Sequence, residues 1–149
     1  MKLLDVNVLL YAHDTSSAHH ARCRDWVLGV VLKGDEHVGL PWQTLLGFVR
    51  IVTHPRAVRR PLTGPEACAI VDRWLARPQA VVVEPGERYW ELLRELVARA
   101  RVQGPLVSDA ALAALALEQG ATLCTTDRDF RRFDGLRVLD PTEDAIHDR

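Results

Sequence analysis

The sequence has few of the features that mark secreted or disulfide-bonded proteins. Its 149 residues include only three cysteines, and these form neither a CxxC pair nor an even set. A disulfide framework or a cysteine-rich metal site therefore has no support in the spacing. Each cysteine lies in a segment with apolar periodicity, so we expect all three to be small buried core residues with free thiols. They are Cys23, Cys68 and Cys124.

Long hydrophobic runs are also missing. The apolar stretch at the start of the chain reaches polar residues by His13, which is too short for a transmembrane helix. No small-residue cleavage site follows it, as a signal peptide would require. We therefore expect a cytoplasmic protein with no membrane partner.

An excess of positive charge is absent as well, since the formal net charge is −1 at pH 7. Binding to a polyanion would then depend on a local basic patch rather than on the charge of the whole molecule. Residues 1–149 have the length and apolar content of one globular domain with a substantial core.

Short apolar stretches alternate with amphipathic stretches along the whole chain. This alternation predicts a parallel sheet covered by helices on both faces, an α/β fold of three α/β/α layers. Strands are expected over residues 2–5, 37–40, 80–83, 121–124 and 136–139. Helices are expected over residues 8–13, 18–32, 42–53, a segment capped at Thr63, 87–101 and 108–118, with a short one near 127–132.

Three aspartates stand where such a sheet places its functional site, beyond the carboxyl ends of the strands. Asp5 ends the first strand, Asp127 closely follows the fourth, and Asp109 begins the helix before the fourth. If the first and fourth strands are neighbours, the three carboxylates converge and repel one another unless a cation lies between them. All-oxygen ligands suit Mg²⁺ or Mn²⁺, and such a cluster best supports phosphodiester hydrolysis.

Several motifs resemble those of PIN-domain ribonucleases, most closely the VapC-type toxins of bacterial toxin–antitoxin pairs. They are LDVNVLLYA at 4–12, LPWQTLLGFVRIVTHPRAV at 40–58, LVSDAALAALA at 106–116 and TTDRDF at 125–130. The resemblance implies a PIN-like fold and a Mg²⁺- or Mn²⁺-dependent endoribonuclease that cuts structured RNA. It also implies a homodimer neutralised by a cognate antitoxin protein.

The resemblance assigns roles to individual residues. Asp5 and Asp109 match the principal metal ligands, Asp127 matches the third acid, and Asn7 matches a polar residue that shapes the site. One departure concerns the glutamate that these enzymes commonly carry in the helix after the second strand. No acid occurs between Glu36 and Glu66, so one well-held ion is expected, with Gln43 as a candidate neutral oxygen ligand.

Each polar residue also has a simpler structural interpretation. Asp5 and Asp109 are residue types that favour helix N-termini, and Asn7 could satisfy only local backbone groups. Thr126 could cap a short helix, with Asp129 completing the capping box instead of shaping the site.

Arginine is concentrated in two segments. Four arginines and no acid lie between positions 50 and 60, and three more follow the third aspartate. Arginine forks suit phosphate, so Arg50, Arg56 and Arg128 are candidate RNA-binding residues, although arginine-rich helix faces are often only solvated.

Two other functions compete with a nuclease. A phosphatase with Asp5 as nucleophile would need a second aspartate where this chain has Asn7. A catalytically weak PIN-like module could still bind RNA or a protein without the usual glutamate. Metal-dependent RNA cleavage distinguishes the nuclease from both.

Overall fold

A computed structural model of the chain describes residues 1–143. It contains a five-stranded sheet in the order β3-β2-β1-β4-β5, in which every neighbouring pair is parallel. The strands are β1 (Lys2–Leu4), β2 (Val38–Pro41), β3 (Ala80–Val83), β4 (Thr122–Cys124) and β5 (Arg137–Leu139). The helices are α1 (Val6–His13), α2 (His20–Lys33), α3 (Trp42–Val52), α4 (Gly64–Leu75), α5 (Tyr89–Arg99), α6 (Leu106–Glu118) and the 3₁₀-helix η1 (Arg128–Arg132).

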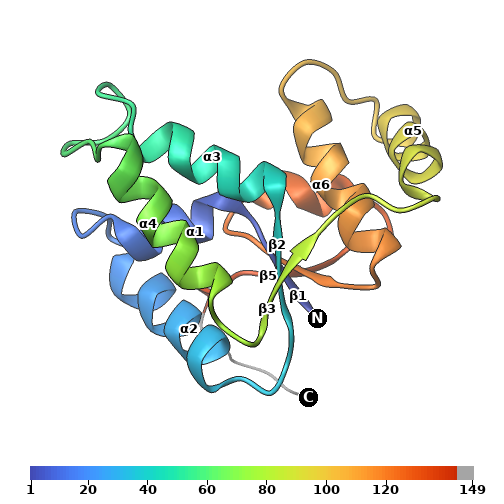
Figure 1. Cartoon of the computed structure of the whole chain (residues 1–149). Helices are drawn as coiled ribbons and strands as arrows, with labels where there is room; N and C mark the ends of the chain where they lie inside the picture. The colour runs from blue at the N-terminus through green and yellow to red at the C-terminus, as the bar shows by residue number, and fades with distance from the viewer. Residues whose placement is uncertain (144–149) are drawn as a thin grey trace.

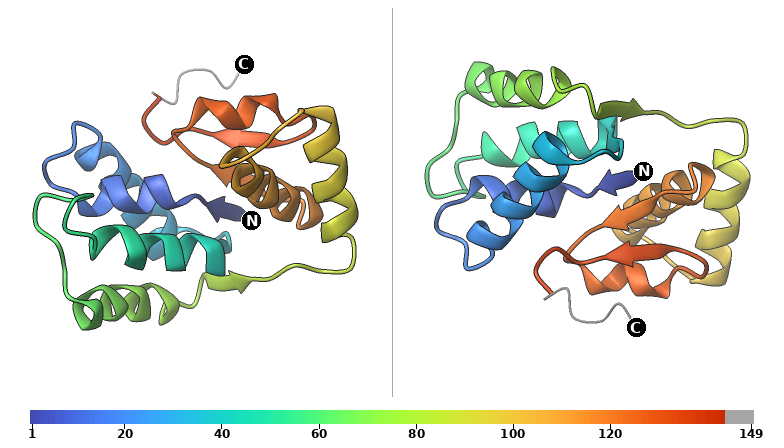
Figure 2. Two further views of the ribbon diagram at one scale, coloured as in Figure 1. Left: turned by 90° about the horizontal axis from the view of Figure 1, so that it is seen from above. Right: turned by 90° about the horizontal axis from the view of Figure 1, so that it is seen from below.

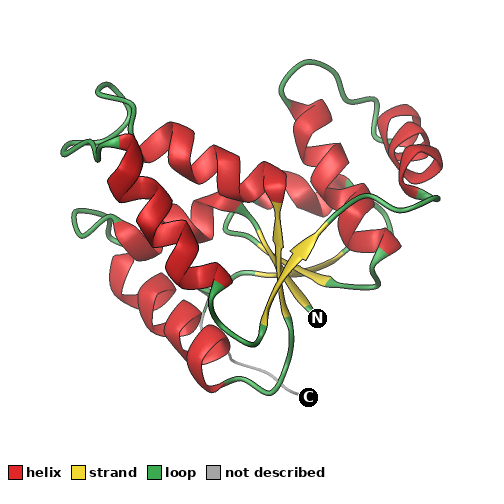
Figure 3. Cartoon of the chain, in the orientation of Figure 1, coloured by secondary structure: helices red, strands yellow, loops and turns green. Residues whose placement is uncertain are grey.

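The helices form a layer on each face of this sheet, which confirms the predicted three-layer α/β/α fold (Figures 1 and 3). On one face, Leu4, Val38 and Leu40 pack against apolar side chains of α1 to α4. On the other face, Leu3 and Leu123 pack against α5, α6 and η1. Figure 2 shows the two groups of helices on opposite sides of the strands.

The strand order places a topological switch point at the centre of the sheet. From β1 the chain winds outward through β2 to β3, and it then returns to add β4 and β5 on the other side of β1. The first and fourth strands are therefore neighbours, with Leu4 beside Cys124 in the register. Ligands of open α/β sheets bind at the carboxyl ends of strands that flank such a point.

Helix boundaries differ from the sequence expectation in two places that affect the site. Helix α1 begins at Val6, two residues earlier than expected, and α6 begins at Leu106 rather than at residue 108. Asn7 and Asp109 therefore both lie within the first turn of a helix, and Asp5 is the residue before one. Apolar periodicity defines the body of a helix better than its ends, so it locates a helix start only to within one or two residues.

The expectation for the cysteines is correct for two of them. Cys23 and Cys124 are buried free thiols, but Cys68 is exposed, so its prediction as a core residue was wrong. In α4 the fully buried positions are Ala67 and Val71, and Cys68 lies one residue further along, about 100° around the helix from Ala67.

Gly39 on β2 leaves room for side chains of the two neighbouring strands, β1 and β3. A Cβ at this position would lie 2.8 Å from Leu3 Cδ1 and 2.8 Å from Val83 Cγ2, closer than carbon atoms pack. Replacing Gly39 by alanine should therefore destabilise the protein by about 1 to 3 kcal/mol, as overpacking does in other cores. Urea denaturation measures this, with Gly29→Ala as a control because nothing lies within 4 Å of a Cβ there. Equal stability of the two variants would contradict the packing argument.

In the part of the chain that the structure describes, none of the helices combines the length and the apolar character needed to cross a bilayer.

Candidate active site

Asp5 occupies the point where β1 passes into α1. Its backbone N–H donates to Cys124 O at 3.0 Å, which continues the pairing of β1 with β4. Its side chain is 8% exposed, and its Oδ1 accepts from the backbone N–H of Val6 at 2.7 Å. The helix-capping interpretation is thus correct for Asp5, and it places the carboxylate at the carboxyl edge of the sheet.

Thr44 fixes the end of β1 from the side of α3. Its buried Oγ1 donates to Leu4 O at 2.8 Å, so the first turn of α3 is attached to the residue before Asp5. No residue between Glu36 and Glu66 is acidic, and Thr44 is the buried polar side chain in this part of α3.

Thr125 connects the residues of the site. Its hydroxyl donates to Asp5 Oδ2 at 2.7 Å and accepts from Asn7 Nδ2 at 3.3 Å and from the backbone N–H of Asp127 at 3.0 Å. The side chain is 1% exposed. Sequence reasoning assigned no role to Thr125, although it lies within the TTDRDF motif and directly follows a buried strand.

Asn7 also contacts the loop after β4. Its Oδ1 accepts from the backbone N–H of Thr126 at 3.4 Å while its Nδ2 donates to Thr125. Asn7 thus joins α1 to this loop and does more than satisfy local backbone groups.

Asp127 caps η1. Its Oδ1 accepts from the backbone N–H of Asp129 at 2.8 Å, so Asp127 is the cap residue and the prediction that Thr126 caps this helix was wrong. The cap residue thus lies one position further along than predicted, and the Thr126 N–H that a capping box would use donates to Asn7 Oδ1 instead. Asp129 faces Arg132, whose guanidinium donates to Asp129 Oδ1 at 2.9 Å, and completes no capping box.

Asp109 lies in the first turn of α6 and is partly buried. Burial, and after it the negative charges of Asp127, Asp5 and Asp129, raise the pKa of Asp109 to about 6, while Arg132 opposes them. The three predicted aspartates therefore lie within electrostatic reach of one another, although they come from α6, β1 and the loop after β4.

The same crowding affects Asp5. Burial raises the pKa of Asp5, the hydrogen bonds from Thr125 and Val6 oppose that rise, and the charge of Asp127 adds to it. Asp5 and Asp109 are therefore both more readily protonated than an exposed aspartate. A bound cation would instead favour their ionised forms.

Gln43 connects the start of α3 to the first turn of α6. Its Nε2 donates to Ser108 O at 2.9 Å, which ties the start of α3 to the residue before Asp109. The amide is exposed, and this contact occupies its nitrogen rather than its oxygen. Its predicted use as a neutral ligand remains a hypothesis.

The donor set suits a hard divalent cation. Carboxylates from three segments, with no sulfur and no histidine among them, are typical of Mg²⁺ or Mn²⁺ sites. Within residues 1–143, no three histidine, cysteine, aspartate or glutamate side chains already stand in the arrangement of a metal site. Burial and the nearby carboxylates, which together raise the pKa of Asp109, both disfavour its negative charge, and a bound cation would offset both effects, so the residues fit such an ion.

The three candidate RNA-binding arginines have different surroundings. Arg128 lies 3.9 Å from Glu143, which also pairs with Arg131 at 3.0 Å, so this part of the basic cluster is partly neutralised. Arg50 and Arg56 lie at the far end of α3 from Gln43, beside His54.

Comparison with known proteins identifies the family. The PIN domain family matches residues 2–136, and the chain belongs to that family. Ribonuclease VapC37 of Mycobacterium tuberculosis is 43% identical over 141 residues, 95% of this chain and 97% of that protein. Ribonuclease VapC43 of the same species is 41% identical over 147 residues, 99% of each chain. Within the PIN-domain family the protein is therefore of the VapC type.

Solved structures share the fold at low identity. FitAcB from Neisseria gonorrhoeae superposes with a TM-score of 0.66 at 19% identity, covering 95% of this chain and 98% of that one. VapC20 of Mycobacterium tuberculosis, a sarcin–ricin loop cleaving toxin, gives 0.64 at 16% identity, covering 92% and 99%.

Proposed function

We propose that the protein is a metal-dependent endoribonuclease and the toxin of a toxin–antitoxin pair. The observation that carries the proposal is the convergence of Asp5, Asp109 and Asp127 at the switch point of the sheet, where burial together with the charges of Asp127 and Asp5 raises the pKa of Asp109 to about 6. The VapC relatives are named ribonucleases, and their similarity extends over almost the whole chain.

Asp5, Asp109 and Asp127 would hold the cation, Mg²⁺ or Mn²⁺. When bound, such an ion supplies Lewis acidity, which makes a nearby water more acidic and offsets the charge of the phosphate. The chain's own part is to orient the ligands. Thr125 and the Val6 N–H bind one oxygen each of Asp5, and Asn7 and Asp127 N–H bind Thr125, so the Asp5 carboxylate has a fixed direction.

The ends of the RNA products test this mechanism. Attack by water with departure of the 3′ oxygen leaves a 3′-hydroxyl and a 5′-phosphate, whereas attack by the neighbouring 2′-hydroxyl leaves a cyclic phosphate. We expect 5′-phosphate ends after incubation of tRNA and rRNA fragments with the protein and Mg²⁺. Cyclic phosphate ends would contradict the proposed hydrolysis.

The partners we propose are an antitoxin protein and a second copy of the chain, in a cytoplasmic complex, with residues 1–149 acting as one PIN-like domain. Solved relatives of the same fold include VapBC complexes, such as VapBC-1 from nontypeable Haemophilus influenzae. Helix α3 supports a homodimer because Trp42 and Leu46 are 47% and 65% exposed on it, while Leu45 and Phe48 face the core. Sedimentation of Leu46→Glu beside the unaltered chain tests this, and equal masses would contradict it.

A second candidate function is that of a binding module, which has the PIN-like fold but does not cleave RNA efficiently. The absence of an acid between Glu36 and Glu66 favours a weak or inactive nuclease that binds RNA or protein. RNA that stays intact with Mg²⁺ and Mn²⁺ but shifts in a binding assay would favour this module.

A further inference from the structure

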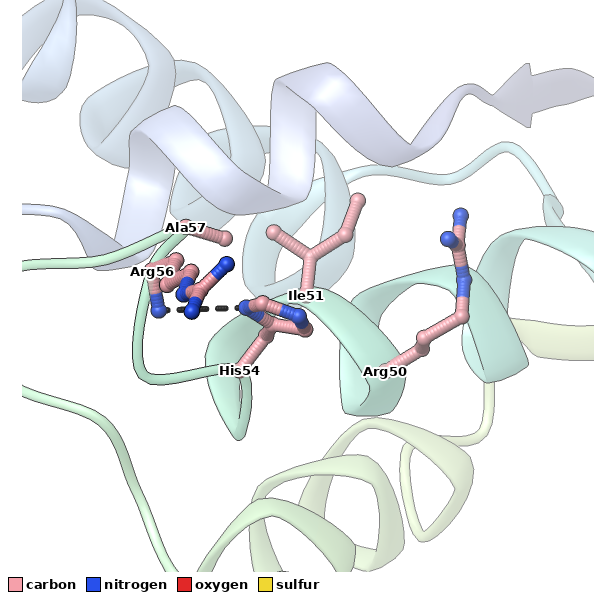
Figure 4. A pocket seen from close by; sticks show the side chains of 5 residues that line it. All are labelled: Arg50, Ile51, His54, Arg56 and Ala57. Atoms are coloured by element: carbon pink, nitrogen blue, oxygen red, sulfur yellow. Dashed lines mark hydrogen bonds between the residues drawn. The ribbon is translucent and has the colours of Figure 1, made fainter.

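A pocket lies on the surface at the C-terminal end of α3, away from the aspartates. It is lined by Arg50, Ile51, His54, Arg56 and Ala57 and has a volume of about 180 Å³ (Figure 4). That volume is several times the roughly 30 Å³ that one water molecule occupies in the liquid. The pocket can therefore hold a group larger than water.

The polar groups around this pocket are hydrogen-bond donors. The backbone N–H of Arg56 donates to His54 Nδ1 at 3.1 Å, drawn as a dashed line in Figure 4. Because Nδ1 accepts, the neutral ring carries its proton on Nε2, which is a donor. Arg50, near the end of α3, adds a second guanidinium at the other end of the pocket, with Ile51 between it and Arg56 (Figure 4).

The two arginines of the pocket have no acidic partner among residues 1–143. Every ion pair formed in that range by arginine involves other positions, such as Arg131 with Glu143 or Arg132 with Asp129. Guanidinium groups at both ends of the pocket and an N–H donor between them, without a carboxylate, favour a polyanion, and arginine forks match phosphate oxygens (Figure 4).

We propose that Arg50, His54 and Arg56 bind the phosphate backbone of RNA at a distance from the bond that is cut. This inference rests on the proposed function, because RNA is the ligand. Helix α3 begins beside the aspartates and its eleven residues span about 16 Å at 1.5 Å per residue. The phosphate in the pocket therefore belongs to a nucleotide several positions from the scissile one, so the site selects longer RNA.

RNA binding tests the pocket without cleavage. In this assay the Asp5→Asn variant is titrated against a fluorescent single-stranded RNA of about 20 nucleotides, or against one of about 4, over a range of salt concentrations. In that background we expect Arg50→Gln with Arg56→Gln to weaken binding of the long RNA about tenfold and to reduce the slope of log affinity against log salt by about 1. Binding of the short RNA should change less than about threefold.

Arg94→Gln with Arg101→Gln is the matched control, because it removes two exposed arginines near α5, on the opposite side of the molecule from the pocket (Figure 1). Equal losses in both double variants would overturn the proposal, since they would reflect total charge alone. Unchanged binding of the long RNA would also overturn it and would leave an acidic protein segment as the occupant. If the unaltered chain cuts no RNA but the pocket arginines still determine binding of long RNA, the proposed hydrolysis fails and the pocket assignment stands.

Discussion

Replacing Asp109 by asparagine should abolish RNA cleavage and, in the absence of divalent cations, raise the melting temperature at pH 7.5. The loss of activity should be at least about 100-fold, since a proposed ligand loses its charge. The gain in stability has a separate cause. Burial and the neighbouring carboxylates raise the pKa of Asp109 to about 6, so its ionised form is disfavoured in the folded chain.

The pH dependence gives the sign of this effect. The ordinary pKa of an aspartate is 3.8, below the folded value, so the folded chain holds this proton more tightly than the unfolded chain does. Stability conferred by the protonated group is fully present below about pH 4 and is lost as pH rises through about 6. The advantage of Asp109→Asn over the unaltered chain should therefore be largest above pH 7 and vanish near pH 4.

Thermal unfolding in EDTA across this pH range measures the difference, and Asp72→Asn on the exposed face of α4 is the control. Adding Mg²⁺ should then raise the melting temperature of the unaltered chain more than that of Asp109→Asn. A variant that is less stable than the unaltered chain at pH 7.5 would contradict the crowding of carboxylates at this edge.

Replacing Thr125 by valine should have the second large effect. Valine has nearly the same shape but no hydroxyl, so Asp5 Oδ2 loses its donor, and Asn7 Nδ2 and the Asp127 N–H lose their acceptor. Buried groups left unsatisfied cost about 1 to 3 kcal/mol each, so we expect a loss of about 2 to 4 kcal/mol in the free energy of unfolding. Cleavage should fall about 10- to 100-fold because the direction of Asp5 is no longer fixed.

Thr125→Ser separates the hydroxyl from the methyl group. It keeps the oxygen that makes all three contacts, so it should retain most of the activity and lose only the packing of one methyl group, about 1 kcal/mol. Urea denaturation and the cleavage rate are measured together. Equal behaviour of the valine and serine variants would show that the hydroxyl has no role in orienting Asp5.

The general plan of this site could be predicted from the sequence because a parallel sheet brings the carboxyl ends of its strands to one edge. Asp5 follows a buried apolar run, and the alternation of elements places the end of that run at an edge with the end of β4. Once β1 and β4 are neighbours, Asp127 and Asp109 have little freedom in where they lie.

The hydrogen bonds within the site could not be predicted in this way. Thr125 is one hydroxyl among ordinary residues, and two of its three contacts, with Asp5 and Asn7, depend on where α1 begins, which apolar periodicity placed two residues too late. The cap of η1 was missed by one residue, since Thr126 and Asp127 are both residue types that cap helices and the Thr126 N–H pairs with Asn7, which is far away in the sequence. Exposed Cys68 reflects the same limit, since a shift of one residue on a helix changes the face by about 100°.

Metal dependence at the end of β1 can be measured by RNA cleavage with the unaltered chain and with Asp5→Asn, each with Mg²⁺, with Mn²⁺ or with excess EDTA. Asp25→Asn, which alters an exposed carboxylate on α2, serves as the matched control. We expect cleavage by the unaltered chain and by Asp25→Asn with either metal, and none in EDTA or with Asp5→Asn. Cleavage that persists in EDTA, or Asp5→Asn cutting as fast as the unaltered chain, would contradict a metal-dependent site at the end of β1.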